Sequence, residues 1–116
     1  MRRAIPVIVL ALIVAACSNA EPDHSPENAS EVTKALWEAA RDGDLTTLAN
    51  AIEQCADPFV EFEAVNGERY TAREIARARR LGELEGAKLV LADPLSLQLA
   101  EGALVKAEND WARACS

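Results

Sequence analysis

A single glycine between two stretches of helical apolar spacing is the feature that most constrains the fold of this chain. Before Gly43, the apolar residues share one helix face, at Val32, Ala35, Leu36, Ala39 and Ala40. After Gly43, a second face consists of Leu45, Leu48, Ala49 and Ile52. Ser30 and Asp44 stand where the N-caps of these two helices are expected. Glycine favours the left-handed conformation that ends a helix, and so short a turn predicts an antiparallel helical hairpin.

The segment from Asp93 to the end of the chain carries the most regular helical pattern. Asp93 can cap a helix, and Pro94 suits the first helical position because an N–H there would be unpaired anyway. Apolar residues then recur at steps of three and four, at Leu97, Ala100, Leu104, Ala107, Trp111 and Ala114. This stripe predicts a capping helix that covers the end of the domain. Docking of the stripe to a partner helix is the alternative.

The composition favours helices and disfavours nucleic acid as a partner. Ala, Leu and Glu dominate, aromatic residues make up 4% of the chain, and the net charge is −7. Few aromatic residues and many good helix formers favour helix over strand. An acidic surface repels both nucleic acid and an anionic bilayer surface. We therefore expect an all-α domain that binds no nucleic acid.

Residues 1–16 have the three parts of a secretory signal peptide in order. Arg2 and Arg3 provide positive charge, an almost wholly apolar run follows, and Ala15 and Ala16 form a small-residue exit. The apolar run is shorter than the about 20 residues needed to cross a bilayer as a helix. We expect cleavage after Ala16, which leaves 100 of the 116 residues, enough for one small domain.

The four residues that end at Cys17, Val-Ala-Ala-Cys, resemble the lipobox of bacterial lipoproteins, with Val in place of the commoner Leu. This resemblance implies that Cys17 is the site of lipidation, and several acyl chains hold a protein stably on a membrane. Ser18 and Asn19 follow Cys17, whereas Asp is the usual inner-membrane retention signal. The resemblance therefore implies a lipid-anchored protein of the bacterial cell envelope, on the outer membrane and facing the periplasm.

Residues 17–29 are expected to form a flexible tether between the lipidated Cys17 and a domain over residues 30–116. This stretch is polar, contains two prolines and shows no apolar periodicity. His24, the one histidine of the chain, lies in it. We expect His24 to be solvated, because a metal site needs three or four converging ligands.

Residues 36–57 resemble the ankyrin repeat. Leu36, two alanines, Gly43, Leu45 and the pair Ala56-Asp57 occur at the spacings of the family pattern. Trp37 stands where the family usually has His, and Cys55 stands where it has Gly. The resemblance implies stacked helical hairpins, in which small alanines permit close packing.

A second, less regular unit follows. Residues 59–65 alternate apolar and acidic, and Asn66-Gly67 is a turn signal, so we expect either a repeat-joining loop or a β-hairpin arm. Thr71, Ala76 and Gly82 resemble positions of a second repeat, although two spacings are each two residues too long. Its second helix would contain Leu84, Ala87, Leu89, Val90 and Leu91. The predicted fold is thus about two ankyrin-like hairpins with a C-terminal capping helix.

If Cys17 carries lipid, Cys55 and Cys115 remain, and an oxidising compartment permits a disulfide between them. Such a bond would tie the exit of the first hairpin to the end of the last helix. Two unbonded cysteines are the alternative, because distances in space cannot be read from the sequence. Neither cysteine has a neighbouring histidine or a CxxC pattern, so redox catalysis is not expected.

Two sets of residues are candidate contacts to a protein partner. Arg69, Arg73, Arg77 and Arg80 recur at helical steps, either as a solvated face paired with Glu68, Glu74 and Glu83 or as a docking stripe for an acidic partner. The ankyrin resemblance implies contacts through hairpin tips and inner helices, which here contain Phe59, Trp37 and Arg41. Core packing is the alternative for Trp37.

These patterns predict a lipid-anchored periplasmic protein that binds another protein, as toxin-occluding immunity lipoproteins do by analogy. The alternative is a structural envelope lipoprotein whose helices only self-associate. The chain contains no Gly-rich phosphate loop, HExxH or GxSxG motif. We therefore expect no catalytic, cofactor-binding or metal-ligating residues.

Overall fold

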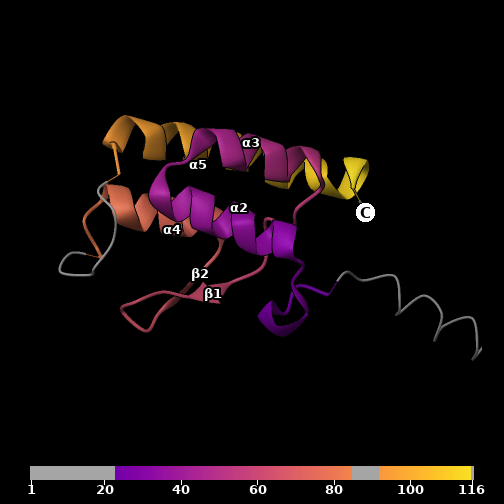
Figure 1. Ribbon diagram of the computed structural model, residues 1–116, viewed down its shortest axis with the longest axis horizontal. Helices are drawn as coiled ribbons and strands as arrows, with labels where there is room; N and C mark the ends of the chain where they lie inside the picture. Colours follow the sequence, from indigo (N-terminus) through magenta and orange to yellow (C-terminus); the bar gives the residue numbers. More distant parts are fainter. Residues whose placement is uncertain (1–22, 85–91, 116) are drawn as a thin grey trace, which may run out of the picture.

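The computed structural model describes residues 23–84 and 92–115. Its helices are η1 (Pro26–Asn28), α2 (Glu31–Asp42), α3 (Leu45–Glu53), α4 (Ala72–Arg80) and α5 (Pro94–Ala114), and its strands are β1 (Phe62–Glu63) and β2 (Arg69–Tyr70). The predicted helical class is confirmed, with one small antiparallel sheet in the described part (Figure 1). The predicted leader, Cys17 and most of residues 84–91 lie outside the described residues.

The first hairpin has the caps that the sequence predicts. The side chains of Ser30 and Asp44 accept hydrogen bonds from the backbone N–H groups of Thr33 and Thr47. Gly43 ends α2 in the left-handed conformation, at φ 72°. α3 buries Leu48 and Ala51 against α2. These caps satisfy N–H groups that have no partner within their helices.

A short β-hairpin connects the first helical hairpin to α4. Phe62 pairs with Tyr70 and Glu63 pairs with Arg69, and Gly67 has a positive φ of 85° in the turn. The expectation of a β-hairpin arm is therefore confirmed. Thr71 follows the second strand and caps α4, where Glu74 completes a capping box.

The four α-helices of the described residues form two layers of two (Figure 1). α2 packs beside α4, α3 packs on α2, and α5 packs on α4 and also reaches α2 and α3. α5, which we expected to cover the end of the domain, packs along α4. Leu84, expected in a helix, is buried in a turn.

Small side chains contribute much of the core. Ala40 of α2 and Ala76 of α4 are fully buried, and these two helices pack against each other. Larger apolar side chains of the same cluster are also almost fully buried: Leu36, Leu48, Ile75, Leu97 and Leu104. The distance between packed helices depends on the side chains at their contact, so alanines allow α2 and α4 to approach closely.

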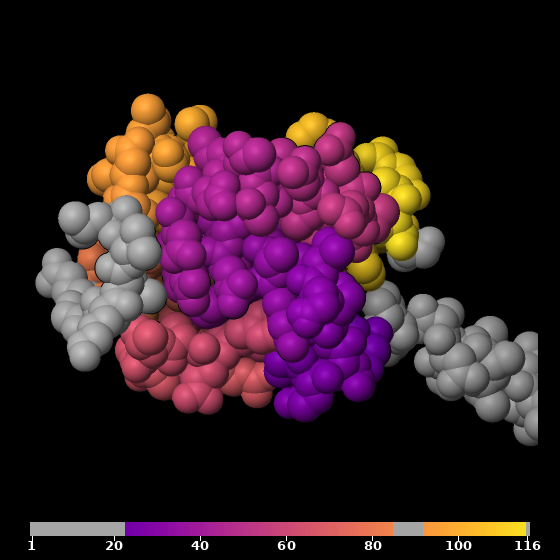
Figure 2. All heavy atoms as spheres, viewed as in Figure 1, coloured from indigo at the N-terminus to yellow at the C-terminus, as the bar shows by residue number. Residues whose placement is uncertain are grey.

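The folded part begins before Ser30, where we expected a flexible tether to end. From residue 23 the chain lies against the domain (Figure 2), and η1 forms one turn within it. Asp23 accepts hydrogen bonds from the N–H of Ser25 and from the Asn28 side chain. Residues 23–29 are therefore part of the domain, and the tether prediction is wrong for them.

Substitution of two glycines by alanine is expected to have opposite effects. Gly43 has a positive φ, and a Cβ there would lie 3.3 Å from the Cβ of Ser96, so Gly43→Ala should lower the free energy of unfolding by about 1–2 kcal/mol. Gly102 lies inside α5 with nothing within 4 Å of such a Cβ, so Gly102→Ala should raise it by roughly 0.5–1 kcal/mol. Urea denaturation of the two variants measures both changes, and equal shifts would contradict this assignment.

Candidate functional site

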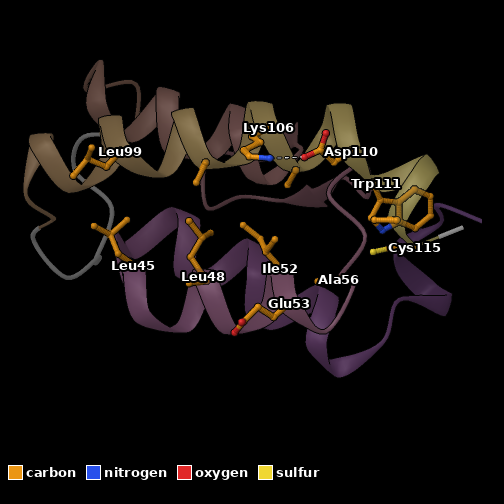
Figure 3. Close-up of a pocket in the computed structure, with 14 residues that line it drawn as sticks. Leu45, Leu48, Ile52, Glu53, Ala56, Leu99, Lys106, Asp110, Trp111 and Cys115 are labelled. Atoms are coloured by element: carbon orange, nitrogen blue, oxygen red, sulfur yellow. Dashed lines mark hydrogen bonds and ion pairs between the residues drawn. The ribbon is translucent and has the colours of Figure 1, made fainter.

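An open apolar groove runs between α3 and α5, with a volume of about 670 Å³. Figure 3 shows its two walls, with Leu45, Leu48 and Ile52 on α3 facing α5. Three small residues of α5 and α3, Ala49, Ala103 and Ala107, complete the lining along its length. Ala49, which we expected on the buried face of its helix, is exposed because α5 does not close over this edge of α3. Spacing alone indicates an apolar face, but not whether a neighbour covers it.

The two ends of the groove differ in chemistry. At one end, Leu45 faces Leu99, whose side chain is 53% exposed (Figure 3). Toward the other end, Glu53 lines the α3 side, while Lys106 and Asp110 line the α5 side. Lys106 and Arg113 each lie 2.7 Å from an oxygen of Asp110. The pKa of Asp110 lies below its ordinary value, mainly because its carboxylate accepts a hydrogen bond from Lys106. One end of the groove is therefore apolar, and the other end carries charges of both signs.

A disulfide and an aromatic cluster close the charged end of the groove. Cys55 and Cys115 are bonded, with Cα atoms 5.5 Å apart. The Trp111 indole N–H points to the carbonyl oxygen of Cys55, with an N···O distance of 3.4 Å. The His24 ring packs 5.7 Å from the Trp111 ring and 5.4 Å from the Phe59 ring. The N-terminal segment, the exit of α3 and the end of α5 are thereby held together.

His24 is the site residue that sequence reasoning missed. We expected it to be solvated in a tether, but its Nδ1 lies 2.5 Å from Oδ2 of Asp57 and its ring contacts two aromatic rings. Asp57 is the aspartate of the ankyrin-like Ala-Asp pair, and it also accepts from the N–H of Phe59. No periodicity marks such a contact, because its two partners are 33 residues apart.

Cys55 has an unusual backbone conformation for a residue with a side chain. Its φ is 61°, in the left-handed region that favours glycine. Residue 55 therefore combines a glycine-like backbone conformation with a crosslink. The disulfide closes a loop of 60 residues, which corresponds to about 4 kcal/mol of stabilisation in the chain-entropy model.

Of the two candidate contact residues on α2, Trp37 is buried and Arg41 is half-buried. Trp37 is only 6% exposed, and its indole N–H donates to the carbonyl oxygen of Tyr70 at 2.9 Å. The Phe62 ring packs edge-on against it at 5.6 Å, so Trp37 attaches the β-hairpin to α2. Arg41 lies over the Trp37 ring at 5.7 Å and donates two hydrogen bonds to Asp42. Trp37 is therefore a core residue rather than an exposed contact.

The arginines predicted to share one helix face have different roles. Arg69 lies on β2, outside α4, and donates to the carbonyl oxygen of Glu61 at 3.4 Å. Arg73 and Arg80 pair with Glu108 and Glu101 of α5. These partners replace the ones expected on or near α4, because α5 is the neighbour that α4 meets. Arg77 is exposed.

Arg79 was not among the expected functional residues, yet it is the most buried of the ion-paired arginines. Its side chain is 10% exposed, donates to the carbonyl oxygen of Arg41 at 2.6 Å and lies 3.6 Å from Asp42. The pKa of Arg79 lies below its ordinary value, mainly because burial disfavours the charged guanidinium. The sequence contains a signal for this role, since Arg79 follows Ile75 by four residues on the buried face of α4.

Neither a metal site nor a membrane-spanning helix is found in the described part of the chain. Over residues 23–84 and 92–115, no three His, Cys, Asp or Glu side chains gather as metal ligands. None of the helices over those residues is long and apolar enough to cross a membrane.

Comparison with protein-family models, curated proteins and solved structures finds no match to the chain. The functional inference therefore rests on this chain's own residues.

The left-handed conformation at residue 55 can be separated from the crosslink by two substitutions. In a Cys115→Ser background, Cys55→Gly should be more stable than Cys55→Ser by about 1–2 kcal/mol, because glycine adopts a positive φ without strain. Both variants should be less stable than the oxidised parent, by roughly 4 kcal/mol for the Ser variant. Thermal and urea unfolding measure these differences. Equal stability of the Gly and Ser variants would exclude the proposed backbone conformation.

Proposed function

We propose that the protein is a lipid-anchored lipoprotein of the bacterial cell envelope whose helical domain binds another protein. The α3–α5 groove is the observation that carries the binding role. It is concave and mainly apolar, and Leu99 at its rim is about half exposed. A concave, mainly apolar groove of about 670 Å³ has the size and lining that are typical of a binding site.

Two independent features support export and anchoring. The leader over residues 1–16 and the lipobox-like residues at Cys17 supply an address and a site for acyl chains. The bond between Cys55 and Cys115 fits an oxidising compartment, since structural disulfides are rare in the cytosol. The first residues of the domain, from Asp23, are only six positions after Cys17, so an anchor would hold the domain close to the membrane.

The arrangement of the helices supports an ankyrin-type interaction module of two units. Each unit would consist of an inner helix, α2 or α4, and an outer helix, α3 or α5, with the β-hairpin between the units. Gly43 and Cys55 stand at glycine positions of the family pattern, and both have a positive φ. Ankyrin arrays need about three repeats for stability, and the disulfide and the long α5 would compensate for a missing third repeat.

Replacement of the lipidated residue tests the anchor. Cys17→Ser should move the protein from the membrane fraction to the soluble periplasmic fraction, and the mass of the mature chain should no longer include acyl groups. The double variant Cys55→Ser/Cys115→Ser is the matched control, because it removes two cysteines and should stay on the membrane. A wild-type protein that retains Met1 and an unmodified Cys17 would contradict the proposal.

Pull-down from detergent-solubilised envelopes at low salt tests the binding role. A different protein recovered in a stoichiometric amount with the wild-type chain is the expected result. Self-association is the competing structural role, and exposed Leu95 and Leu99 are residues through which it could occur. Sedimentation of the purified mature chain separates the two roles. A stable homo-oligomer without a second protein would favour the structural alternative.

A further inference from the structure

We propose that the disulfide between Cys55 and Cys115 is a redox-controlled latch for the end of α5. In the oxidised protein it holds the last turns of α5 against the exit of α3. When a dithiol reduces the bond, these turns are released while the rest of the domain stays folded. The release is a property of the fold, whereas its effect on a partner rests on the proposed function.

The last turns of α5 are the side of the bond that can move. The three buried residues of α5 all lie in its first half: Leu97, Ala100 and Leu104. Every residue of positions 105–114 is exposed or half-buried. Arg73 of α4 lies 2.9 Å from Glu108, but Asp110 pairs with two basic residues of its own helix. Burial therefore anchors the first half of α5 but not the turns after Glu108.

The aromatic contacts at this end are made at the surface. Trp111 is half-buried, and its indole nitrogen lies 3.4 Å from the carbonyl oxygen of Cys55, which is long for a hydrogen bond. Its ring packs at 5.7 Å on the ring of His24 and at 5.9 Å on that of Phe59, which is itself 37% exposed. A short helix end without buried residues opens at little cost. The covalent bond is therefore the main constraint on it.

The exit of α3 is fixed without the disulfide. The N–H of Ala56 donates to the carbonyl oxygen of Ala51, and the N–H of Cys55 donates to that of Ile52, each at 3.0 Å. This pair of bonds is the Schellman motif, which ends a helix with one residue in the left-handed conformation. Cys55 is that residue, at φ 61°. Because only backbone groups take part, reduction should leave the exit of α3 in place and release α5.

The bond is accessible to a reductant, since Cys55 is exposed and Cys115 is half-buried. The reductant would be a protein dithiol, such as that of a thiol–disulfide oxidoreductase. Its thiolate attacks one sulfur to form a mixed disulfide, and the other cysteine leaves as a thiolate. Its second thiol then breaks the mixed disulfide, so that two electrons and two protons pass from the dithiol to Cys55 and Cys115. Exposed disulfides are the ones that such exchange reaches most readily.

The released turns form part of the proposed binding groove. Asp110, Trp111 and Cys115 line its charged end, and all three come after Glu108 (Figure 3). Their release removes part of one wall of the groove. The oxidised protein is therefore the form that binds the partner, and reduction should weaken binding.

Backbone ¹⁵N relaxation of the purified mature protein, with and without dithiothreitol, tests the latch. On reduction, the order parameters of residues 109–115 should fall from about 0.85, the value of a rigid backbone, to below about 0.6. Those of α2 and α4 should stay at the rigid value. The matched variant Cys55→Ser/Cys115→Ser should show the released state with or without dithiothreitol.

Two results of the relaxation experiment would overturn the latch. Residues 109–115 could stay rigid after reduction, and the other contacts would then hold them without the bond. Alternatively, folded signals could disappear throughout the domain, and the disulfide would then stabilise the whole fold rather than one end of α5.

Pull-down with the same variant separates the latch from the proposed function. Recovery of the partner should fall about tenfold or more for Cys55→Ser/Cys115→Ser compared with the oxidised wild type. Equal recovery would contradict control of binding by the latch. If the wild type itself recovers no partner, the proposed function fails together with the effect on binding, whereas the relaxation experiment alone decides on the latch.

Discussion

The close contact between α2 and α4 is the constraint on which the rest of the molecule depends. Ala40 of α2 and Ala76 of α4 are fully buried, and a larger side chain at either position would overpack the core. Once α2 and α4 lie side by side, α3 and α5 pack on the same face of this helix pair. α3 is held by α2 and α5 by α4, so the two outer helices meet only in part. The apolar groove between them is a direct consequence.

Elements that depend on local chemistry could be predicted from the sequence. Ser30, Asp44 and Asp93 cap helices as expected, and Gly43 ends α2, because these effects act over a few residues. Contacts between distant segments could not be predicted in the same way. The exposure of Ala49 depends on where α5 ends up, and the contact of His24 with Trp111 joins positions 87 residues apart. The pairing of Cys55 with Cys115 remained an open alternative for the same reason.

The contacts that hold distant segments together lie at one end of the proposed binding groove. The bond from Cys55 to Cys115, the Trp111 ring and the His24 contact hold three separate segments there. His24 of the N-terminal segment contacts Trp111 at the same end, seven positions after Cys17 in the sequence. A binding surface held rigidly loses little conformational entropy when a partner docks. The crosslinked end would therefore serve both the fold and the proposed binding of a partner protein.

The central claim is that the lining of the groove is open to solvent in the free protein. Relaxation of methyl groups by a soluble paramagnetic agent, measured by NMR on the oxidised mature chain, tests it directly. The methyl groups of Leu99, Leu45 and Ile52 should relax strongly, whereas those of Leu36 and Ile75, which are at most 1% exposed, should be protected. Equal protection of all five residues would contradict the account, because the groove would then be covered by the chain itself or by a second copy.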